Sequence, residues 1–527
     1  MDSSLKQLSS VDPLVWASGR LSVRGGLFNL GGHSYQCDLV SRDKRVRVVK
    51  KGTQLGATLV YQLEAIHGLV FRRFPLGVMY MMPSEKTVER FSKLRFTPMF
   101  DGNIWLKRYL SVNNANEKVI NGGNLIFVGA RSQQVGGTST KDSSALRTFE
   151  CDIVYRDEVD LHDMEMVEQS KQRLNYSKVR GQVNLGSPTV PGYGIDLMYE
   201  ESDQCRWVIP CGFCGKLTCI EEDFPKSIQM LGGVWCRVCV HCGRLIFVHD
   251  GRWESRYPDR DIRGYWASSF LSPRADLKEY MTRYHHSDGS ALCEFERSIL
   301  GRASIEAENQ LSDVTVLDRC GSDGLRHYSG VDTVMGVDVG KVIHAVIGVR
   351  TGRDSYAVLN VSAVESFEEL HALAARMKVR LCVMDAMPDI HASRKFQQEE
   401  PYSVFLCRYS EQMPGVPDWD SRGGGVKCNR NEWCDRVHDV FSTGKVSLPR
   451  NCPELRVFAK QLSSTAKAII THPDTGIQKP RWIKRGDDHY FHSMLYFLLG
   501  CQRSGIIDRC GFVAPKRFRT AASTFYL

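Results

Sequence analysis

The sequence predicts two successive α/β domains, and three features support this. The chain has 527 residues, too many for one hydrophobic core. Short apolar strands alternate with helical patterns in its first part, and this alternation begins again near residue 331. The stretch at about 205–252 is instead rich in Cys, Gly and Trp. We therefore expect a first domain at 1–311 with an insertion at about 205–252, a linker at 312–330, a second domain at 331–505 and a basic tail at 506–527.

The first domain is expected to contain five apolar strands that form a parallel sheet. The first is followed by a Gly-containing loop and by a helix at 59–69, where LVYQLEAIHGL has helical periodicity. The expected strands are 45–50, 76–83, 123–130, 151–158 and 181–188. In such a sheet, functional groups gather at the carboxyl ends of the strands.

Composition is that of an ordinary globular protein, with 42% hydrophobic and 24% charged residues. The net charge of +9 suits a partner with a phosphate backbone but also occurs in proteins that bind no nucleic acid. The N-terminus lacks a signal-peptide pattern, and no apolar run approaches the ~20 residues that span a bilayer. The expected compartment is reducing, so clusters among the 18 cysteines should bind metal rather than form disulfides.

The segment VVKKGTQLGATLVYQL joins a strand, a short loop and a helix start. Backbone amides and a helix N-terminus in such a loop bind phosphates, and a hydroxyl reaches Mg²⁺. The usual pattern GxxxxGK is not met, because Ala57 stands at the position of its lysine. Lys50 or Lys51 offers a substitute ammonium, and Thr58 offers the hydroxyl. A plain strand–loop–helix connection is the alternative.

CDIVYRDEVD is an apolar strand ending in two adjacent carboxylates. In an ATPase, Asp157 would hold Mg²⁺ and Glu158 would polarise the attacking water. A solvated acidic strand end is the simpler interpretation. The strand follows the loop after further α/β elements, and this position favours the ATPase interpretation of the two carboxylates.

PCGFCGK and CVHCGR are two C-x-x-C-G turns. Two thiolates on one such turn form half of a tetrahedral Zn²⁺ site, and two turns complete it. The predicted ligands are Cys211, Cys214, Cys239 and Cys242, with Cys236 and His241 close enough in sequence to be confused with them. A Cys₄ shell leaves no open position for chemistry, so the site is expected to be structural.

In the second domain, VMGVDVGK ends a strand on Asp338 and RLCVMDAMPD ends another on Asp385. The helix beginning GDDHYFHS adds further candidates: Asp487, Asp488, His489 and His492. Three carboxylates from two strands and a helix suit two Mg²⁺ or Mn²⁺ ions that cleave a phosphodiester. A single Asp at a strand end is more often a cap or turn residue.

The loop resembles that of the large terminase subunits of tailed bacteriophages, in the branch related to the lambda packaging enzyme. In that family the phosphate-loop lysine begins the motif, before a Gln-x-Gly-x-Ser/Thr run. Lys51, Gln54, Gly56 and Thr58 match this pattern, and Lys50 is the less favoured lysine. The resemblance covers about residues 40–500. It implies a P-loop ATPase domain with a zinc-binding insertion, followed by an RNase H-like nuclease domain.

Other segments resemble the same family. LGSPT matches a short motif that links hydrolysis to movement, with Ser187 and Thr189 as its polar members. Arg131 and Arg147 are candidates for the arginine finger. The family's last nuclease motif has an Asp that aligns with His492 here. Asp488 lies four residues earlier on the same helix face and is taken as the third carboxylate, with Asp487 in reserve and His492 as a neighbouring ligand.

The resemblance implies a motor that hydrolyses ATP to move double-stranded viral DNA into a procapsid, and a metal-dependent endonuclease that cuts concatemeric DNA. It implies the cofactors ATP, Mg²⁺ or Mn²⁺ and structural Zn²⁺. The implied partners are DNA, a small terminase subunit and the portal protein. During packaging the chain would form a homo-oligomeric ring. It would act in the host cytoplasm and would be absent from the mature virion. Two alternatives stay open: a helicase- or translocase-type ATPase-nuclease of repair or restriction, and a non-enzymatic zinc-dependent DNA-binding protein.

Overall fold

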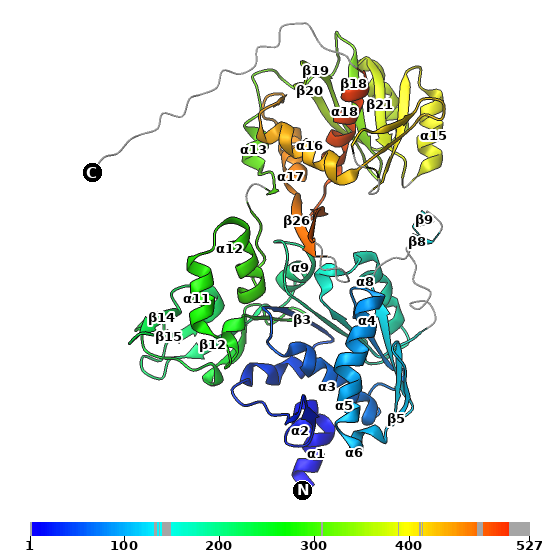
Figure 1. Cartoon of the computed structure of the whole chain (residues 1–527). Helices are drawn as coiled ribbons and strands as arrows, with labels where there is room; N and C mark the ends of the chain where they lie inside the picture. Colours follow the sequence, from blue (N-terminus) through cyan, green and yellow to red (C-terminus); the bar gives the residue numbers. More distant parts are fainter. Residues whose placement is uncertain are drawn as a thin grey trace, which may run out of the picture. The chain divides into compact units, whose positions relative to one another are not determined.

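A computed structural model of the chain describes residues 3–504 apart from 131–133, 136–137, 140–148, 307–308, 388, 411–412, 414 and 472–477. The chain divides into two compact units, each built on its own sheet (Figure 1). Unit 1 comprises Met1–Glu306 and Ile470–Lys479, and unit 2 comprises Ala307–Ile469 and Pro480–Leu527. The predicted α/β class is confirmed in both. The predicted tail at 506–527 lies outside the described residues.

The central strands of unit 1 run parallel in the spatial order β17–β3–β11–β10–β4–β7. They are β3 (Val46–Lys51), β4 (Val78–Met82), β7 (Gly123–Gly129), β10 (Ile153–Asp157), β11 (Gly181–Gly186) and β17 (Ile262–Ala267). All but β17 lie on stretches that the apolar pattern predicts. The edges are completed by β5 (Leu110–Asn113), β6 (Glu117–Ile120), β12 (Cys205–Pro210), β13 (Leu217–Cys219) and β16 (Arg252–Ser255). The order places the carboxyl ends of β3, β11 and β10 side by side.

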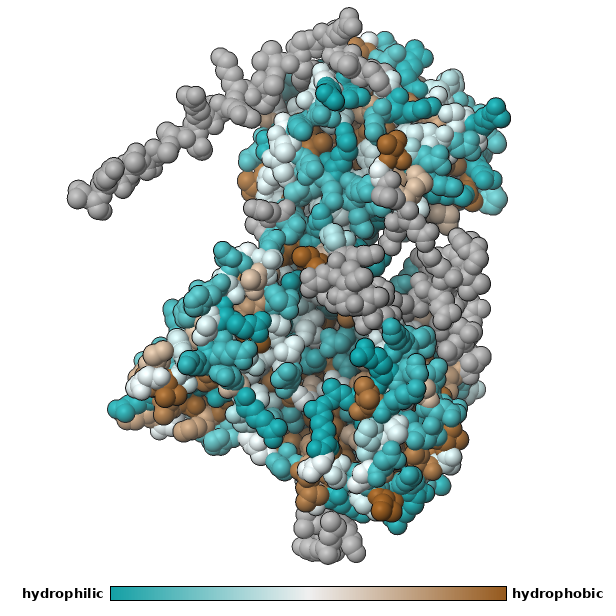
Figure 2. Space-filling model, viewed as in Figure 1, coloured by the Kyte–Doolittle hydropathy of each residue, from teal (hydrophilic) through white to brown (hydrophobic). Residues whose placement is uncertain are grey.

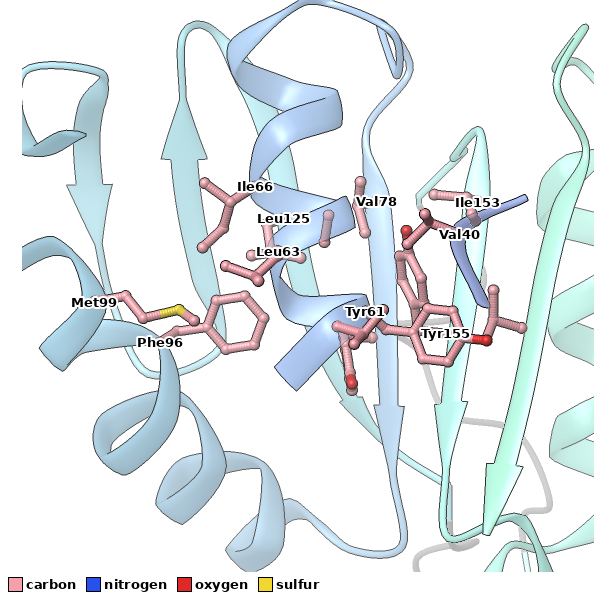
Figure 3. Close-up of a cluster of buried hydrophobic side chains, with 14 of the residues drawn as sticks. Val40, Tyr61, Leu63, Ile66, Val78, Phe96, Met99, Leu125, Ile153 and Tyr155 are labelled. Carbon is pink, nitrogen blue, oxygen red and sulfur yellow. The ribbon is translucent and has the colours of Figure 1, made fainter. Parts of the chain in front are cut away.

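The helix α3 (Ala57–Val70) covers one face of this sheet. Figure 3 shows Leu63 and Ile66 of α3 facing Val78 and Leu125 of the sheet, all of them buried. Alternate residues of β3 therefore face opposite layers: Val49 packs in the α3 core, whereas Val48 packs with α9 (Gly194–Glu200). This alternation decides which lysine at the end of β3 faces which layer.

Further helices of unit 1 surround this sheet, and short elements complete the unit: β1 (Ser22–Val23), β2 (Gly26–Leu27), β8 (Gln134–Val135), β9 (Thr138–Ser139), η4 (Gln172–Leu174), η5 (Val248–Asp250) and η6 (Ser269–Leu271). The further helices are α1 (Ser3–Val11), α2 (Pro13–Ala17), η1 (Ser34–Val40), α4 (Glu85–Phe91), η2 (Ser92–Phe96), α5 (Thr97–Asp101), α6 (Ile104–Lys107), η3 (Val159–Leu161), α8 (Met164–Lys171), α10 (Ile220–Asp223), α11 (Leu277–His285), α12 (Gly289–Phe295) and η7 (Glu296–Leu300). A hairpin of β14 (Ile228–Leu231) and β15 (Val234–Arg237) projects from the Cys-rich insertion. Met230, Leu231 and Val234 on it are exposed, and Figure 2 shows apolar residues gathered there.

Unit 2 has a mixed sheet in the order β23–β24–β22–β21–β18–β19–β20–β25. Its strands are β18 (Thr333–Asp338), β19 (Ile343–Arg350), β20 (Tyr356–Val364), β21 (Val379–Asp385), β22 (Ser403–Tyr409), β23 (Asp418–Asp420), β24 (Gly425–Cys428) and β25 (Val446–Ser447). The first three form an antiparallel meander. On the other side of β18 follow β21, β22 and β24, each parallel to the strand before it.

Helices cover both faces of the unit 2 sheet. One face carries α14 (Phe367–Arg376) and α15 (Ile390–Glu399), and the other carries α16 (Arg430–Ser442), α17 (Pro453–Ser463) and α18 (His489–Ser504). Gly336 lies directly under α18, since a Cβ there would be 2.1 Å from the Phe497 amide nitrogen. The stretch predicted as a linker at 312–330 contains α13 (Asp313–Leu317), whose Val316 is buried in the core of unit 2.

Candidate functional site

The loop between β3 and α3 has the backbone of a tight phosphate-binding turn. Gln54 and Gly56 both have positive φ, 59° and 78°, and Gly56 is the N-cap of α3. Gly52 has no room for a side chain, because a Cβ would be 2.5 Å from the Ile299 carbonyl oxygen. The loop therefore presents the N-terminus of α3, with its unpaired amides, at the carboxyl end of β3.

The two lysines of β3 point to opposite faces of the sheet. Lys51 Nζ lies 3.3 Å from Glu158 Oε1, at the loop. Lys50 Nζ instead lies 3.1 Å from Asp196 Oδ1 and over the rings of Tyr199 and Trp266, with centroid distances of 4.2 and 4.6 Å. The structure thus brings Lys51 to the loop and places Lys50 in a buried ion pair on the α9 face.

Asp157 ends β10 beside Lys51. It is buried, and among the described residues its Oδ1 has no hydrogen-bond partner. Burial and the charge of Glu158 raise the pKa of Asp157 to about 6, although Lys51 and Thr58 act to lower it. A buried carboxylate oxygen without a partner beside a threonine hydroxyl is a donor set that suits Mg²⁺. Glu158 follows in a left-handed conformation with φ 57° and a side chain that is 39% exposed.

Asp160 is a site residue that the sequence did not single out. Its buried carboxylate accepts hydrogen bonds from the amide and hydroxyl of Thr189 at 2.8 and 2.7 Å, and from the Ile195 amide at 2.7 Å. Burial raises the pKa of Asp160 to about 6 against the effect of these donors. Ser187 is close to the same turn, with its amide 3.5 Å from Glu158 Oε2. The only sequence signal was a third acidic residue in RDEVD.

A cleft of about 1100 Å³ opens over the loop. Lys51, Gln54, Gly56, Thr58 and Glu158 line it, together with residues of the 22–36 segment, η2 and 269–280. Its charged lining consists of Arg24, Lys51, Arg95, Arg274 and Glu158. This excess of positive charge suits a polyphosphate. The two arginine-finger candidates, Arg131 and Arg147, lie outside the described residues.

The Cys-rich insertion brings four sulfurs together. Cys211 Sγ is 3.6 Å from Cys242 Sγ, Cys214 Sγ is 3.6 Å from Cys239 Sγ, and all four lie within 4.8 Å of one another. The two turns have the same backbone: the amides of Gly215 and Gly243 donate to the carbonyls of Cys211 and Cys239 at 2.9 and 2.8 Å. Both glycines have φ of 72°.

The local backbone also favours thiolates at these turns. The amides of Cys214 and Phe213 lower the pKa of Cys211. Burial acts to raise the pKa of Cys239, but the amides of His241 and Cys242 lower it to about 6. Cys236 and His241 are turned elsewhere, toward the carbonyls of Val234 and Leu217.

In unit 2, Asp338 and Asp385 end neighbouring parallel strands and share the face covered by α18, since Val334 and Val383 of the same strands pack in that core. His489 Nδ1 lies 2.8 Å from Asp338 Oδ2, and its ring stacks on His344 with centroids 4.7 Å apart. Burial raises the pKa of Asp385 to about 6, and the charge of Asp338 acts in the same direction. The two carboxylates therefore lie close enough to repel each other.

Asp488 contacts two basic side chains, Lys484 and His492. Its Oδ1 is 2.8 Å from Lys484 Nζ, and its Oδ2 is 3.4 Å from His492 Nε2. Burial acts to raise the pKa of Asp488, but His492 and Lys484 hold this pKa well below its usual range. The other ring nitrogen of His492 lies 2.8 Å from the Tyr409 hydroxyl. Asp487 is exposed. Among the described residues, only the four cysteines form a cluster with every ligand atom within 4.8 Å.

Comparisons with known proteins return phage terminases. A family model described as the ATPase domain of phage terminase large subunit gpA matches residues 37–260. The large terminase of a thermophilic bacteriophage, solved in complex with ADP, is similar, with 11% identity over 88% of this chain and 96% of that chain and a TM-score of 0.31. The ATPase domain of the Thermus phage P74-26 large terminase has 17% identity over 54% of this chain and 99% of that chain, with a TM-score of 0.30. Comparison with curated proteins finds no match. The matched segment contains the phosphate loop and the acidic strand end, and this part of unit 1 is similar to the ATPase domain of phage terminase large subunits.

Proposed function

We propose that this protein is the motor of viral DNA packaging, which hydrolyses ATP in unit 1 to move double-stranded DNA into a procapsid. The observation that carries the proposal is the convergence of Lys51, Asp157 and Glu158 beside the N-terminus of α3, with Lys51 and Glu158 lining a basic cleft. The match of residues 37–260 to the family model of the terminase ATPase domain supports it.

Each residue of this site has a proposed role. The amides at the start of α3 and the Lys51 ammonium bind the β- and γ-phosphates, and Lys51 stabilises the charge that develops during transfer. Asp157 and Thr58 would hold Mg²⁺, which supplies charge neutralisation between the phosphates when bound. Glu158 orients the attacking water. Its contact with Lys51 at 3.3 Å places both side chains at the loop.

The four-cysteine cluster is proposed to hold one structural Zn²⁺. Both turns present their sulfurs to the same point, and the lowered pKa values of Cys211 and Cys239 favour the thiolates that Zn²⁺ needs. The cluster connects the end of β12 to the turn that follows β15, so the ion would fix the insertion to the main sheet. The metal would then contribute to stability rather than to chemistry.

Unit 2 is proposed to be an RNase H-like, metal-dependent endonuclease that cuts concatemeric DNA. An antiparallel meander followed by parallel strands, with Asp338 and Asp385 at adjacent strand ends beneath a helix, supports this proposal. These two carboxylates would hold the metal ions, which activate water and stabilise the leaving oxygen when bound. Asp488 stays the proposed third carboxylate, with Asp487 and His492 as alternatives.

The proposed partners are DNA, a small terminase subunit and the portal protein, with the chain acting as a homo-oligomeric ring in the host cytoplasm. In the part of the chain that the structure describes, we find no helix long and apolar enough to cross a membrane.

The decisive experiment is steady-state ATP hydrolysis by the full chain, with and without linear double-stranded DNA. Hydrolysis that DNA stimulates and that Lys51→Ala abolishes would support the motor. DNA binding without any hydrolysis would instead favour the non-enzymatic zinc-dependent DNA-binding protein. A repair- or restriction-type translocase would hydrolyse ATP but would fail to package DNA into procapsids.

A further inference from the structure

The two cysteine turns of the insertion repeat each other in more than their sulfurs. Residues 211–217 read CGFCGKL and residues 239–245 read CVHCGRL, so each turn carries a ring, a cation or cationic group and a leucine at equivalent positions. All six of these side chains are exposed. Together they make up the knuckle surface: Phe213, Lys216, Leu217, His241, Arg244 and Leu245.

Contacts between the turns hold the knuckle surface together. The Arg244 guanidinium lies over the Phe213 ring, 4.6 Å from its centroid. His241 Nε2 lies 3.2 Å from the Leu217 carbonyl oxygen. The first turn is thus in contact with the second at two points, and the two sets of side chains form one surface rather than two.

The charge of this surface is one-sided. Between residues 205 and 249 the acidic residues are Glu221, Glu222 and Asp223. Each already has partners: the first is buried against Ser268, the second pairs with two arginines, and the third accepts a backbone amide. In the described part of the chain, no acidic side chain pairs with Lys216 or Arg244. Both cations are therefore available to a carboxylate from outside.

The hairpin of β14 and β15 extends the surface with apolar side chains. β15 ends at Arg237, immediately before the second turn, and Val238 pairs with Leu245 in an isolated bridge. Met230 and Val234 on the hairpin are 55% and 63% exposed, and Figure 2 shows apolar residues gathered on this part of unit 1. Exposed apolar side chains gathered in this way, with cations beside them, are typical of an interaction site.

The mixture of side chains decides which kind of partner fits. A nucleic-acid backbone would satisfy the two cations but would leave the leucines and the hairpin in contact with water, whereas nucleic-acid interfaces are strongly polar. A protein segment with carboxylates beside apolar side chains would satisfy both parts of the surface. Phe, Met and Arg, which this surface presents, are also enriched where proteins bind each other.

We propose that the knuckle surface and the adjoining hairpin bind a protein segment that carries acidic and apolar side chains together. The four-cysteine cluster then acts as the scaffold that holds the two turns in register. Residues 205–252 are all described, and none of them lines the nucleotide cleft. Changes to the surface should therefore leave ATP hydrolysis at the wild-type rate.

The test measures the binding of fluorescein-labelled probes to the full chain by fluorescence anisotropy. The probes are an amphipathic helical peptide of Glu and Leu, the same peptide with Ser in place of each Leu, a Lys–Leu counterpart, and a short DNA duplex. We expect the Glu–Leu peptide to bind with a Kd below about 100 μM, and the Glu–Ser and Lys–Leu peptides to bind at least about tenfold more weakly.

Two double variants separate the contributions of charge and apolar area. Lys216→Glu/Arg244→Glu should weaken binding of the Glu–Leu peptide by about tenfold or more, and Leu217→Ser/Leu245→Ser should have a similar effect. Neither variant should change the affinity for the DNA duplex by more than about twofold. Leu245→Ser alone decides the apolar part if the double leucine variant does not fold, because Leu245 is an exposed residue.

The matched control is Lys86→Glu/Lys178→Glu, which makes the same change in net charge at two exposed lysines of unit 1 and should leave peptide binding unchanged. Zinc content and thermal unfolding check that each variant keeps the insertion folded. The proposal is overturned if the Glu–Leu peptide does not bind, if the Glu–Ser peptide binds equally well, or if the control loses as much affinity. A loss of DNA affinity in Lys216→Glu/Arg244→Glu with unchanged peptide binding would assign the surface to nucleic acid instead.

Discussion

Replacing the adjacent lysines of β3 one at a time should separate stability from catalysis. In Lys50→Met, Asp196 loses the ammonium at 3.1 Å while its own side chain is only 11% exposed. Breaking one partner of a buried ion pair costs about 3–5 kcal/mol. The lower end applies here, because Asp196 keeps the Gly192 amide and methionine fills most of the space between Tyr199 and Trp266.

The same change at the next position should have the opposite profile. Glu158, the partner of Lys51, has a side chain that is 39% exposed and can regain water, so Lys51→Met should cost about 1 kcal/mol or less. Removal of its charge from the phosphate site should lower kcat for ATP by about 10²–10³-fold. Lys50→Met should keep kcat within a few-fold at a temperature where it is folded.

The assay is thermal unfolding together with steady-state ATP hydrolysis for both variants. A loss of about 3 kcal/mol corresponds to a Tm lower by about 5 °C in a unit of this size. Lys86→Met, on the exposed side of α4, is the control and should change stability by less than about 0.5 kcal/mol. If Lys50→Met abolishes hydrolysis at an unchanged Tm while Lys51→Met remains active, the assignment of the two faces is wrong.

Three further predictions follow from other parts of the chain. The purified protein should contain about one Zn²⁺ per chain, and Cys211→Ser should lower both the metal content and the Tm; folded protein without zinc by elemental analysis would exclude the site. Asp338→Asn should abolish Mg²⁺-dependent plasmid cleavage by the full chain but leave ATP hydrolysis intact. Asp488→Asn should do the same, whereas His492→Ala should weaken cleavage and alter the Mg²⁺/Mn²⁺ preference; full cleavage by Asp488→Asn would assign the third ligand elsewhere. Burial lowers the pKa of His67 from 6.5 to about 4, so the unfolded chain takes up a proton at a higher pH than the folded chain does. The free energy of unfolding should therefore fall by about 2 kcal/mol between pH 7 and 5. Thermal unfolding should show a smaller pH dependence in His67→Gln, and an unchanged pH dependence would contradict the role given to His67.

Much of the fold was predictable because the decisive signals are local. The apolar runs at 45–50, 76–83, 123–130, 151–158 and 181–188 all form strands of the unit 1 sheet, since fully buried parallel strands need continuous apolar sequence. The stretch at 312–330 lacks such a pattern, and the burial of Val316 in the core of unit 2 depends on helices more than a hundred residues later.

The sites divide in the same way. The spacing within each C-x-x-C-G turn places two sulfurs together by local geometry, and the structure adds that the two turns face each other. Asp160 could not be recognised, because its hydrogen-bond partners are 29 and 35 residues away and consist largely of backbone amides that any sequence would supply.

By itself, the sequence determined which residue types end the strands: two lysines on β3, two carboxylates on β10, and one Asp each on β18 and β21. It left open whether Lys50 or Lys51 faces the loop, and which group on the last helix approaches Asp338. Tertiary structure decided the first question. Alternation along a strand makes neighbouring side chains point to opposite faces of the sheet, but only the packing of α3 and α9 determines which face each lysine reaches. It also placed His489 on Asp338 and turned Asp488 toward Lys484, because the position of α18 over the sheet, and not the order of residues along it, decides which side chains meet.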